Sequence, residues 1–193
     1  MKLINTPTDE TIISGIAADV GEFRIRNSAK AFSILSSGLY ANKIKAIIRE
    51  LSCNAVDSHI AAGKPDVPFS VHLPSALEPW FSVRDYGVGL NHEEVCDIYT
   101  TYFESTKTTS NLFIGALGLG SKSPFAYTNN FSVTAIKDGI QRIYSAYIND
   151  DGVPSIVLMG ETEATDETGV EVKFSVEDNK DFYKFEAEAK DVY

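Results

Sequence analysis

Several features that define whole classes of protein are scarce or missing in this sequence. Its two cysteines, Cys53 and Cys96, form no CxxC pair and no Cys/His cluster, which argues against a disulfide framework and against a zinc site. No apolar run approaches the roughly 20 residues that a membrane-spanning helix needs, and residues 1–10 lack the apolar core of a signal peptide. Internal repeats and low-complexity tracts are missing as well. We therefore expect a globular chain that works in the reducing cytosol.

Positive charge is also scarce. The 193 residues include 17 Lys and Arg against 27 Asp and Glu, a formal net charge of −10. This balance argues against a broad nucleic-acid surface. An anionic ligand would need local groups instead: helix N-termini, backbone amides, a few lysines and a divalent cation. A chain of this length, with 44% hydrophobic residues, suits one domain, or one domain with the start of another, and can bury a core without disulfides.

Apolar residues recur at helical spacing in the first half of the chain. They predict a helix over residues 29–40 and a second helix that Asn42 caps and Gly63 stops. A short helix is expected over residues 93–102, and one or two helical turns over 121–127.

Strand patterns dominate the rest of the chain. Runs bounded by turn residues predict strands at 67–73, 80–84, 131–137, 141–148, 155–159 and 170–176. Asp138-Gly139 is a strong hairpin signal between two of them. Helices come first and strands mostly later, joined by hairpins. We therefore expect an α+β two-layer sandwich, with a mixed, mostly antiparallel sheet covered on one face by helices.

A polar trio lies on the second predicted helix. At 100° per residue, Glu50, Asn54 and Asp57 share an arc of roughly 60°, next to the apolar stripe. The three side chains would therefore face a cleft. Taken alone, the trio is more typical of the solvated face of an amphipathic helix.

A DxGxG pattern, Asp85, Gly87 and Gly89, directly follows the strand predicted at 80–84. The end of the strand would deliver a carboxylate into a pocket, and the glycines would let the backbone approach a flat ligand closely. The alternative is a simple glycine-rich turn.

Two further glycine patterns come later. Gly115, Gly118 and Gly120 follow a segment, residues 103–121, whose Ser, Thr and Gly content predicts a long loop or lid. Their backbone amides suit a phosphate cradle, although the spacing matches neither a Walker A motif nor a dinucleotide fingerprint, and a flexible linker is the alternative. Thr168-Gly169 then opens the last predicted strand.

The order and spacing of these four patterns carry more information than any one of them. ExxxNAxD on a helix, DxGxG after a strand, GxxGxG after a loop and a TG strand resemble the N box and the three glycine boxes of the gyrase, heat-shock chaperone, histidine kinase and MutL (GHKL) family. The resemblance covers about residues 40–176. It implies a Bergerat-type ATP-binding domain over 29–177 with a lid at about 103–121, after an N-terminal extension at 1–28. Residues 178–193 look like the start of a following helix in a longer protein.

The resemblance also implies roles for these residues, with ATP and Mg²⁺ as cofactors. Glu50 would be the general base that acts on the attacking water, and Asn54 would bind Mg²⁺. Asp85 would accept a hydrogen bond from the adenine amino group. Asp57 is expected in a supporting role.

The glycines and two lysines would complete the ligand site. Glycines of the DxGxG box would leave room beside the base, and lid amides would reach the phosphates. Lys107 and Lys122 are the cations nearest to the lid, and one of them is a candidate phosphate contact. The third glycine box usually reads Gly-Thr, whereas here Val170 follows Gly169, so Thr168 is the candidate to replace the usual threonine.

A narrower resemblance lies outside the boxes. Residues 31–40, 42–44 and 49–51 are similar to the N-terminal part of the rIIA lysis-control proteins of T-even-type bacteriophages, as are residues 9–13. It implies the cytoplasm of an infected bacterium as the setting, at most peripheral to the inner membrane.

Three functions follow from the family resemblance. The first is an ATPase whose nucleotide state gates formation of a homodimer. The second is a nucleotide-sensing module with little turnover. The third is a kinase of the histidine-kinase branch, which is less favoured because His59, His72 and His92 lie on no separate dimerisation helix. The residues identify no protein client.

Overall fold

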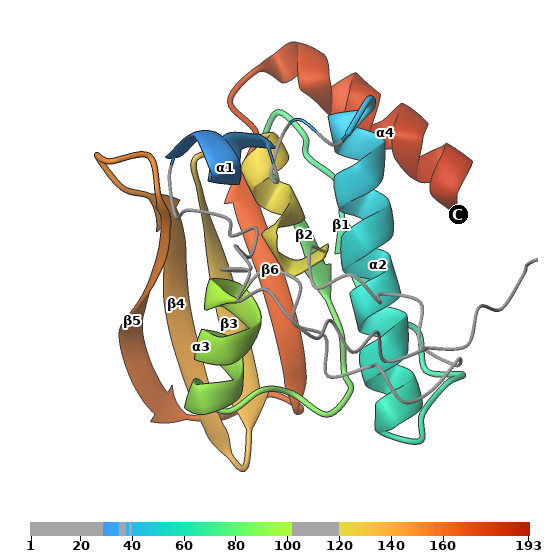
Figure 1. The fold of residues 1–193 in the computed structure, drawn as a ribbon. Coiled ribbons are helices and arrows are strands. Elements are labelled where there is room, and N and C mark those ends of the chain that lie inside the picture. The colour runs from blue at the N-terminus through green and yellow to red at the C-terminus, as the bar shows by residue number, and fades with distance from the viewer. Residues whose placement is uncertain (1–28, 35–37, 39, 102–119) are drawn as a thin grey trace, which may run out of the picture.

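The computed structural model describes residues 29–34, 38, 40–101 and 120–193. Helices lie on one face of a six-stranded sheet, so the expected α+β sandwich is confirmed (Figure 1). The helical elements are α1 (Ala29–Ser33), α2 (Lys43–Ala61), α3 (His92–Thr100), the 3₁₀ helix η2 (Gly120–Ala126) and α4 (Asn179–Val192). The strands are β1 (Ser70–His72), β2 (Trp80–Arg84), β3 (Asn130–Lys137), β4 (Ile140–Ile148), β5 (Pro154–Glu163) and β6 (Gly169–Ser175).

Helix α2 is the longest helix of the described part and forms where the sequence predicts it. The Asn42 side chain caps it by accepting a hydrogen bond from the amide of Lys45. Ile47, Ile48 and the other apolar residues of the stripe are buried against the sheet. The arc next to this stripe carries polar side chains, which places Glu50 and Asn54 in the site described below.

The sheet has the order β1-β2-β6-β3-β4-β5, and each of its pairings is antiparallel. Asp138 and Gly139 both have positive φ, 55° and 73°, as the predicted hairpin turn between β3 and β4 requires. Strand β6 lies between β2 and β3. The end of β2 and the start of β6 therefore lie side by side, with Arg84 opposite Glu171.

Helix α4 occupies the segment 178–193, for which we expected a following helix. It packs on the same core as the rest of the fold, with Phe185 fully buried against Phe81, Phe174 and Tyr127. At its end, the Tyr193 hydroxyl lies 2.6 Å from Ser52 Oγ on α2. The two helices are also joined by an ion pair between Lys45 and Asp191.

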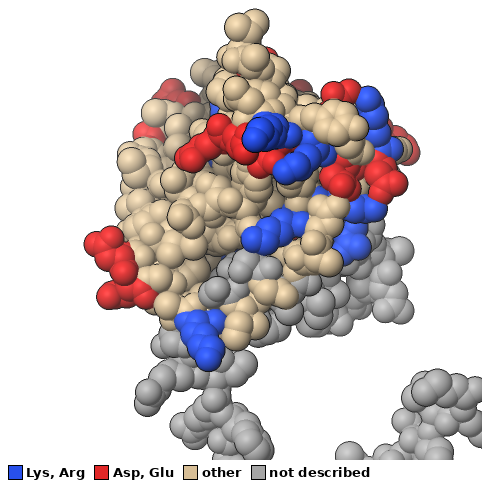
Figure 2. All heavy atoms as spheres, turned by 90° about the horizontal axis from the view of Figure 1, so that it is seen from above, with Lys and Arg blue, Asp and Glu red and all other residues tan. Residues whose placement is uncertain are grey.

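Charges of both signs alternate on the face seen in Figure 2. Exposed ion pairs of the described residues include Lys45–Asp191 and Lys190–Glu186. No continuous basic surface is visible there, which agrees with the acidic composition. Among the helices of the described residues, none is long and apolar enough to cross a bilayer.

Candidate functional site

Helix α2 brings Glu50 and Asn54 to the same place, one turn apart, beside η2. A Cβ atom added at Gly120 would lie 2.9 Å from Glu50 Oε2 and 3.3 Å from Asn54 Nδ2. The first residue of η2 therefore touches both polar side chains of α2. The Glu50 side chain is 23% exposed and also contacts the exposed Arg49 guanidinium at 3.3 Å. This end of the site therefore combines the Glu50 carboxylate, the Asn54 carboxamide and, at Gly120, a backbone position without a side chain.

Lys122 lies two residues further along η2 and is 2% exposed. Its ammonium group donates hydrogen bonds to the carbonyl oxygens of Ile98 and Thr101. In this arrangement Lys122 ties η2 to the C-terminal end of α3. A role in binding phosphate stays a prediction. Lys107, Gly115 and Gly118 lie outside the described residues.

Asp85 follows directly on β2 and forms the other end of the site. It is 6% exposed, and its Oδ1 accepts hydrogen bonds from Ser58 Oγ and from the Gly87 amide, both at 2.9 Å. Its Oδ2 accepts one from the Val170 amide at 3.2 Å. A carboxylate has about four acceptor positions. In the described part of the chain three are used, so Oδ2 can accept one more hydrogen bond.

Burial is the main influence on the Asp85 carboxyl. It raises the pKa of Asp85 above the usual value, because removal from water disfavours the charged form, and the Gly87 and Ser58 hydrogen bonds offset part of the rise. Burial likewise raises the pKa of the Tyr99 hydroxyl, and the nearby negative charge of Asp85 adds to it. The Asp85 carboxylate is therefore surrounded by hydrogen-bond donors within a buried region of low dielectric constant. This environment strengthens any hydrogen bond that the carboxylate accepts.

The glycines around Asp85 are required by close packing. A Cβ at Gly87 would lie 2.2 Å from Ser58 Oγ, and one at Gly89, where φ is +63°, would lie 2.0 Å from the Ile136 carbonyl oxygen. A Cβ at Gly169 would lie 2.0 Å from the Asp85 carbonyl oxygen. The first and third glycine patterns thus meet at Asp85, as the resemblance implies.

Thr168 and Asp57 occupy different surroundings from those of the central residues. The Thr168 methyl group would be 2.9 Å from a Cβ at Gly89, so this side chain borders the DxGxG turn. The hydrogen bond from the last strand to Asp85 comes from the Val170 amide. Asp57 is 1% exposed. It lies within the packed interior, and its supporting role stays a prediction.

Two residues of the site escaped the sequence analysis. Ser58 Oγ donates to Asp85 and lies 3.3 Å from the Val88 amide, which donates to it. His59 accepts a hydrogen bond from the Tyr86 amide. Both follow the ExxxNAxD pattern on α2, where helical periodicity alone gives no reason to single them out.

The donor set at Glu50 and Asn54 suits a hard cation shared with phosphate oxygens. Among the described residues, no group of three or more His, Cys, Asp or Glu side chains could hold a metal alone. Mg²⁺ uses one or two protein oxygens together with substrate phosphates. The Asn54 carboxamide oxygen fits that requirement, and Gly120 beside it carries no side chain.

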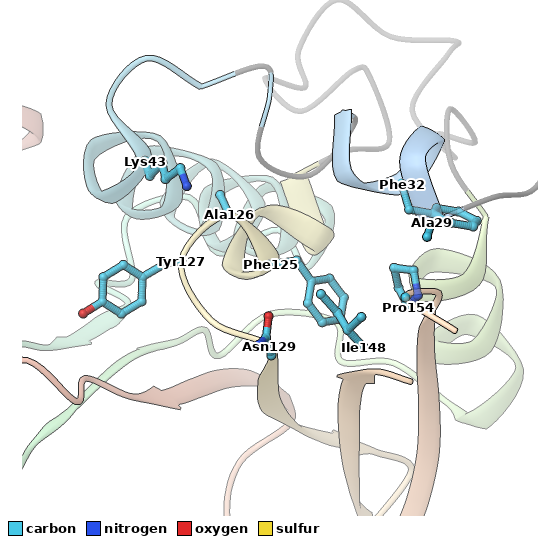
Figure 3. Close-up of a pocket in the computed structure, with 10 residues that line it drawn as sticks. Ala29, Phe32, Lys43, Phe125, Ala126, Tyr127, Asn129, Ile148 and Pro154 are labelled. Atoms are coloured by element: carbon cyan, nitrogen blue, oxygen red, sulfur yellow. The ribbon is translucent and has the colours of Figure 1, made fainter. Parts of the chain in front are cut away.

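A hollow of about 430 Å³ lies elsewhere, between α1, the start of α2, η2 and the end of β4 (Figure 3). Its walls include the apolar side chains of Phe32, Phe125 and Ile148, and the polar ones of Lys43 and Asn129. None of the site residues predicted from the sequence lines this hollow, so the hollow is separate from the candidate site.

The chain is similar to a known protein over part of its length. No protein-family model matches the chain. Over 137 residues, covering 60% of this chain, it is 28% identical to the chaperone protein HtpG of Rickettsia akari (strain Hartford). The chain spans about a fifth of the length of that chaperone (22%).

Proposed function

We propose that this chain is an ATP-binding domain of the GHKL type that binds ATP with Mg²⁺ and hydrolyses it slowly. One observation carries the proposal: the described parts of four patterns that are distant in the sequence lie close together. Gly120 lies against Glu50 and Asn54 on α2, Gly87 lies against Ser58 of the same helix, and Gly169 lies against the Asp85 carbonyl group. Residues 50 and 58 are about 12 Å apart along a helix axis, a separation that suits the two ends of an extended nucleotide. The similarity to HtpG, a GHKL-family chaperone, supports the same class.

Each residue has a chemical task in this proposal. The Asp85 Oδ2 atom accepts a hydrogen bond from the adenine amino group, for which guanine has a carbonyl oxygen instead. The absence of a side chain at Gly120 would let phosphate oxygens approach the backbone beside Glu50 and Asn54. Asn54 would hold Mg²⁺, which supplies neutralising charge to the phosphates. Glu50 orients a water and accepts its proton.

The position of Lys122 favours a second candidate, a nucleotide sensor with little turnover. Its ammonium group is engaged by the Ile98 and Thr101 carbonyls. A site in which that cation stays away from the phosphates would bind ATP and hydrolyse it rarely. The kinase alternative has no comparable support.

The resemblance to the rIIA phage proteins is the basis of a proposal for the biological setting. The chain would act as part of an rIIA-like phage protein in the host cytoplasm, at most peripheral to the inner membrane. ATP binding would promote a homodimer or another conformational change.

Calorimetry with ATP and GTP, each with and without Mg²⁺, tests the core of the proposal. We expect saturable ATP binding that Mg²⁺ strengthens and that exceeds GTP binding. Phosphate release under single-turnover conditions, with protein in excess, then separates the ATPase from the sensor. Absence of ATP binding at millimolar nucleotide would refute both.

A further inference from the structure

His59 is a buried histidine on α2, 2% exposed, whose two ring nitrogens both contact backbone groups. Nδ1 lies 2.7 Å from the Val67 carbonyl oxygen, in the connection between α2 and β1. Nε2 lies 2.7 Å from the Tyr86 amide nitrogen, in the turn that follows β2. The imidazole therefore bridges two loops across the end of the helix.

These two partners define the tautomer of the ring. An amide N–H can only donate, so Nε2 must be the unprotonated nitrogen that accepts from Tyr86. A carbonyl oxygen can only accept, so Nδ1 carries the proton and donates to Val67. The two hydrogen bonds therefore assign the proton of the ring to Nδ1 and the acceptor to Nε2.

The peptide unit that His59 contacts is the one between Asp85 and Tyr86. Its N–H is bound by His59, and its carbonyl oxygen lies against Gly169, where a Cβ would approach to 2.0 Å. The peptide plane is thus held at both ends. Together with the Asp85 amide, which donates to the Val170 carbonyl oxygen at 2.9 Å, this plane fixes the direction in which the Asp85 side chain leaves the backbone.

We infer that His59 is a positioning residue for nucleotide binding: through the Tyr86 amide it holds the Asp85 carboxylate in the orientation that receives the base. The inference rests on the proposed function. Ser58 holds the same turn through the Asp85 carboxylate and the Val88 amide. His59 acts on the backbone between them, at a point that no hydroxyl on α2 reaches in the described structure.

Two substitutions separate the hydrogen bonds of the ring. Gln reaches about as far as Nε2, so His59→Gln keeps an acceptor for the Tyr86 amide and loses the donor to Val67. Asn ends at the level of Nδ1, so His59→Asn keeps that donor and leaves the Tyr86 amide unpaired. Each variant loses one buried hydrogen bond, so both should lower the melting temperature to a similar extent. His72→Asn and His72→Gln, on β1 away from Asp85, serve as matched controls.

The measurements are ATP affinity by calorimetry in the folded range, hydrogen exchange of the Tyr86 amide, and the tautomer of His59 by ¹⁵N NMR. We expect His59→Asn to weaken ATP binding about tenfold or more and to lose Tyr86 protection. His59→Gln should stay within about threefold of wild type and keep that protection. The wild-type ring should show the tautomer with its proton on Nδ1.

The outcomes distinguish this inference from the proposed function. If wild type binds ATP and the Asn and Gln variants bind it equally well or equally poorly, the positioning role is overturned. A proton on Nε2 in wild type overturns it as well. If wild type binds no ATP, the proposed function and the nucleotide role fall together, and Tyr86 protection that differs between the two variants would leave only anchoring of the turn.

Discussion

A methyl group added at Gly120 would enter the space between the Glu50 carboxylate and the Asn54 amide. The new Cβ would lie 2.9 Å from Glu50 Oε2, whereas ordinary contacts begin at 3.4 Å, so the carboxylate must retreat by about 0.5 Å. Catalytic groups need placement to within about 0.5 Å, and a 1 Å error can lower a rate about 10²-fold. We therefore expect Gly120→Ala to slow phosphate release about tenfold or more.

The same substitution should leave the fold almost unchanged. Gly120 has no left-handed backbone conformation that would exclude alanine, so its effect on unfolding free energy should stay within about 1 kcal/mol. Gly160→Ala on β5 is the matched control, because a Cβ there meets nothing within 4 Å.

Single-turnover phosphate release and ATP calorimetry on both variants provide the assay. Gly160→Ala should match wild type in each measurement. A Gly120→Ala protein that binds and hydrolyses ATP as wild type does would show that the reacting groups do not meet at Gly120, and the site would have to be sought elsewhere.

Four more predictions concern the polar residues of the site. Glu50→Ala should retain ATP binding and lose turnover by about 10²–10⁴-fold, as phosphate release beside calorimetry would reveal; undiminished release would favour the nucleotide sensor. Asn54→Ala should weaken the binding of Mg²⁺-ATP itself, and equal affinity in the presence of Mg²⁺ would remove Asn54 from the metal site. Asp85→Asn places a donor opposite the adenine amino group and should weaken ATP binding by roughly 1–3 kcal/mol. Because burial raises the pKa of Asp85, the ionised acceptor is lost as pH falls through that raised value. Wild-type ATP affinity should therefore decline at a pH above the usual aspartate value of about 3.9, and Asp85→Asn, titrated in parallel, should lack that component.

The elements that the sequence predicts best are those whose burial is regular. Strand β2 was predicted with its observed bounds, Trp80–Arg84, because its apolar residues face a helix-covered core and turn residues bound it. The strand predicted at 67–73 is shorter, Ser70–His72, because Pro68 has no amide to pair and Val67 turns towards His59. Strand β5 runs on through polar residues to Glu163, since pairing with β4 requires only backbone groups.

The same distinction applies to the site residues: regular helix periodicity predicts some of their positions, whereas contacts between distant segments determine the others. Periodicity gives the angle of a residue around a helix, and it correctly brings Glu50 and Asn54 to one side. It cannot tell what covers the helix at each height, so Asp57, on the same arc, is buried at 1% exposure. The contacts that hold Asp85 are made between segments distant in the sequence, and only the folded chain brings them together.

Ser58 and His59 illustrate why such contacts matter to function. A carboxylate at the end of a strand can select a ligand only when its direction is maintained, because recognition requires polar groups that are held close to the productive geometry. Here the carboxylate is bonded by Ser58, Gly87 and Val170, and the adjoining peptide by His59. The motif residues define which chemistry is available, and the neighbours on α2 orient it. A variant that alters this orientation while keeping every motif residue is therefore the sharpest test of whether the orientation of Asp85 matters to nucleotide binding, and His59→Asn is that variant.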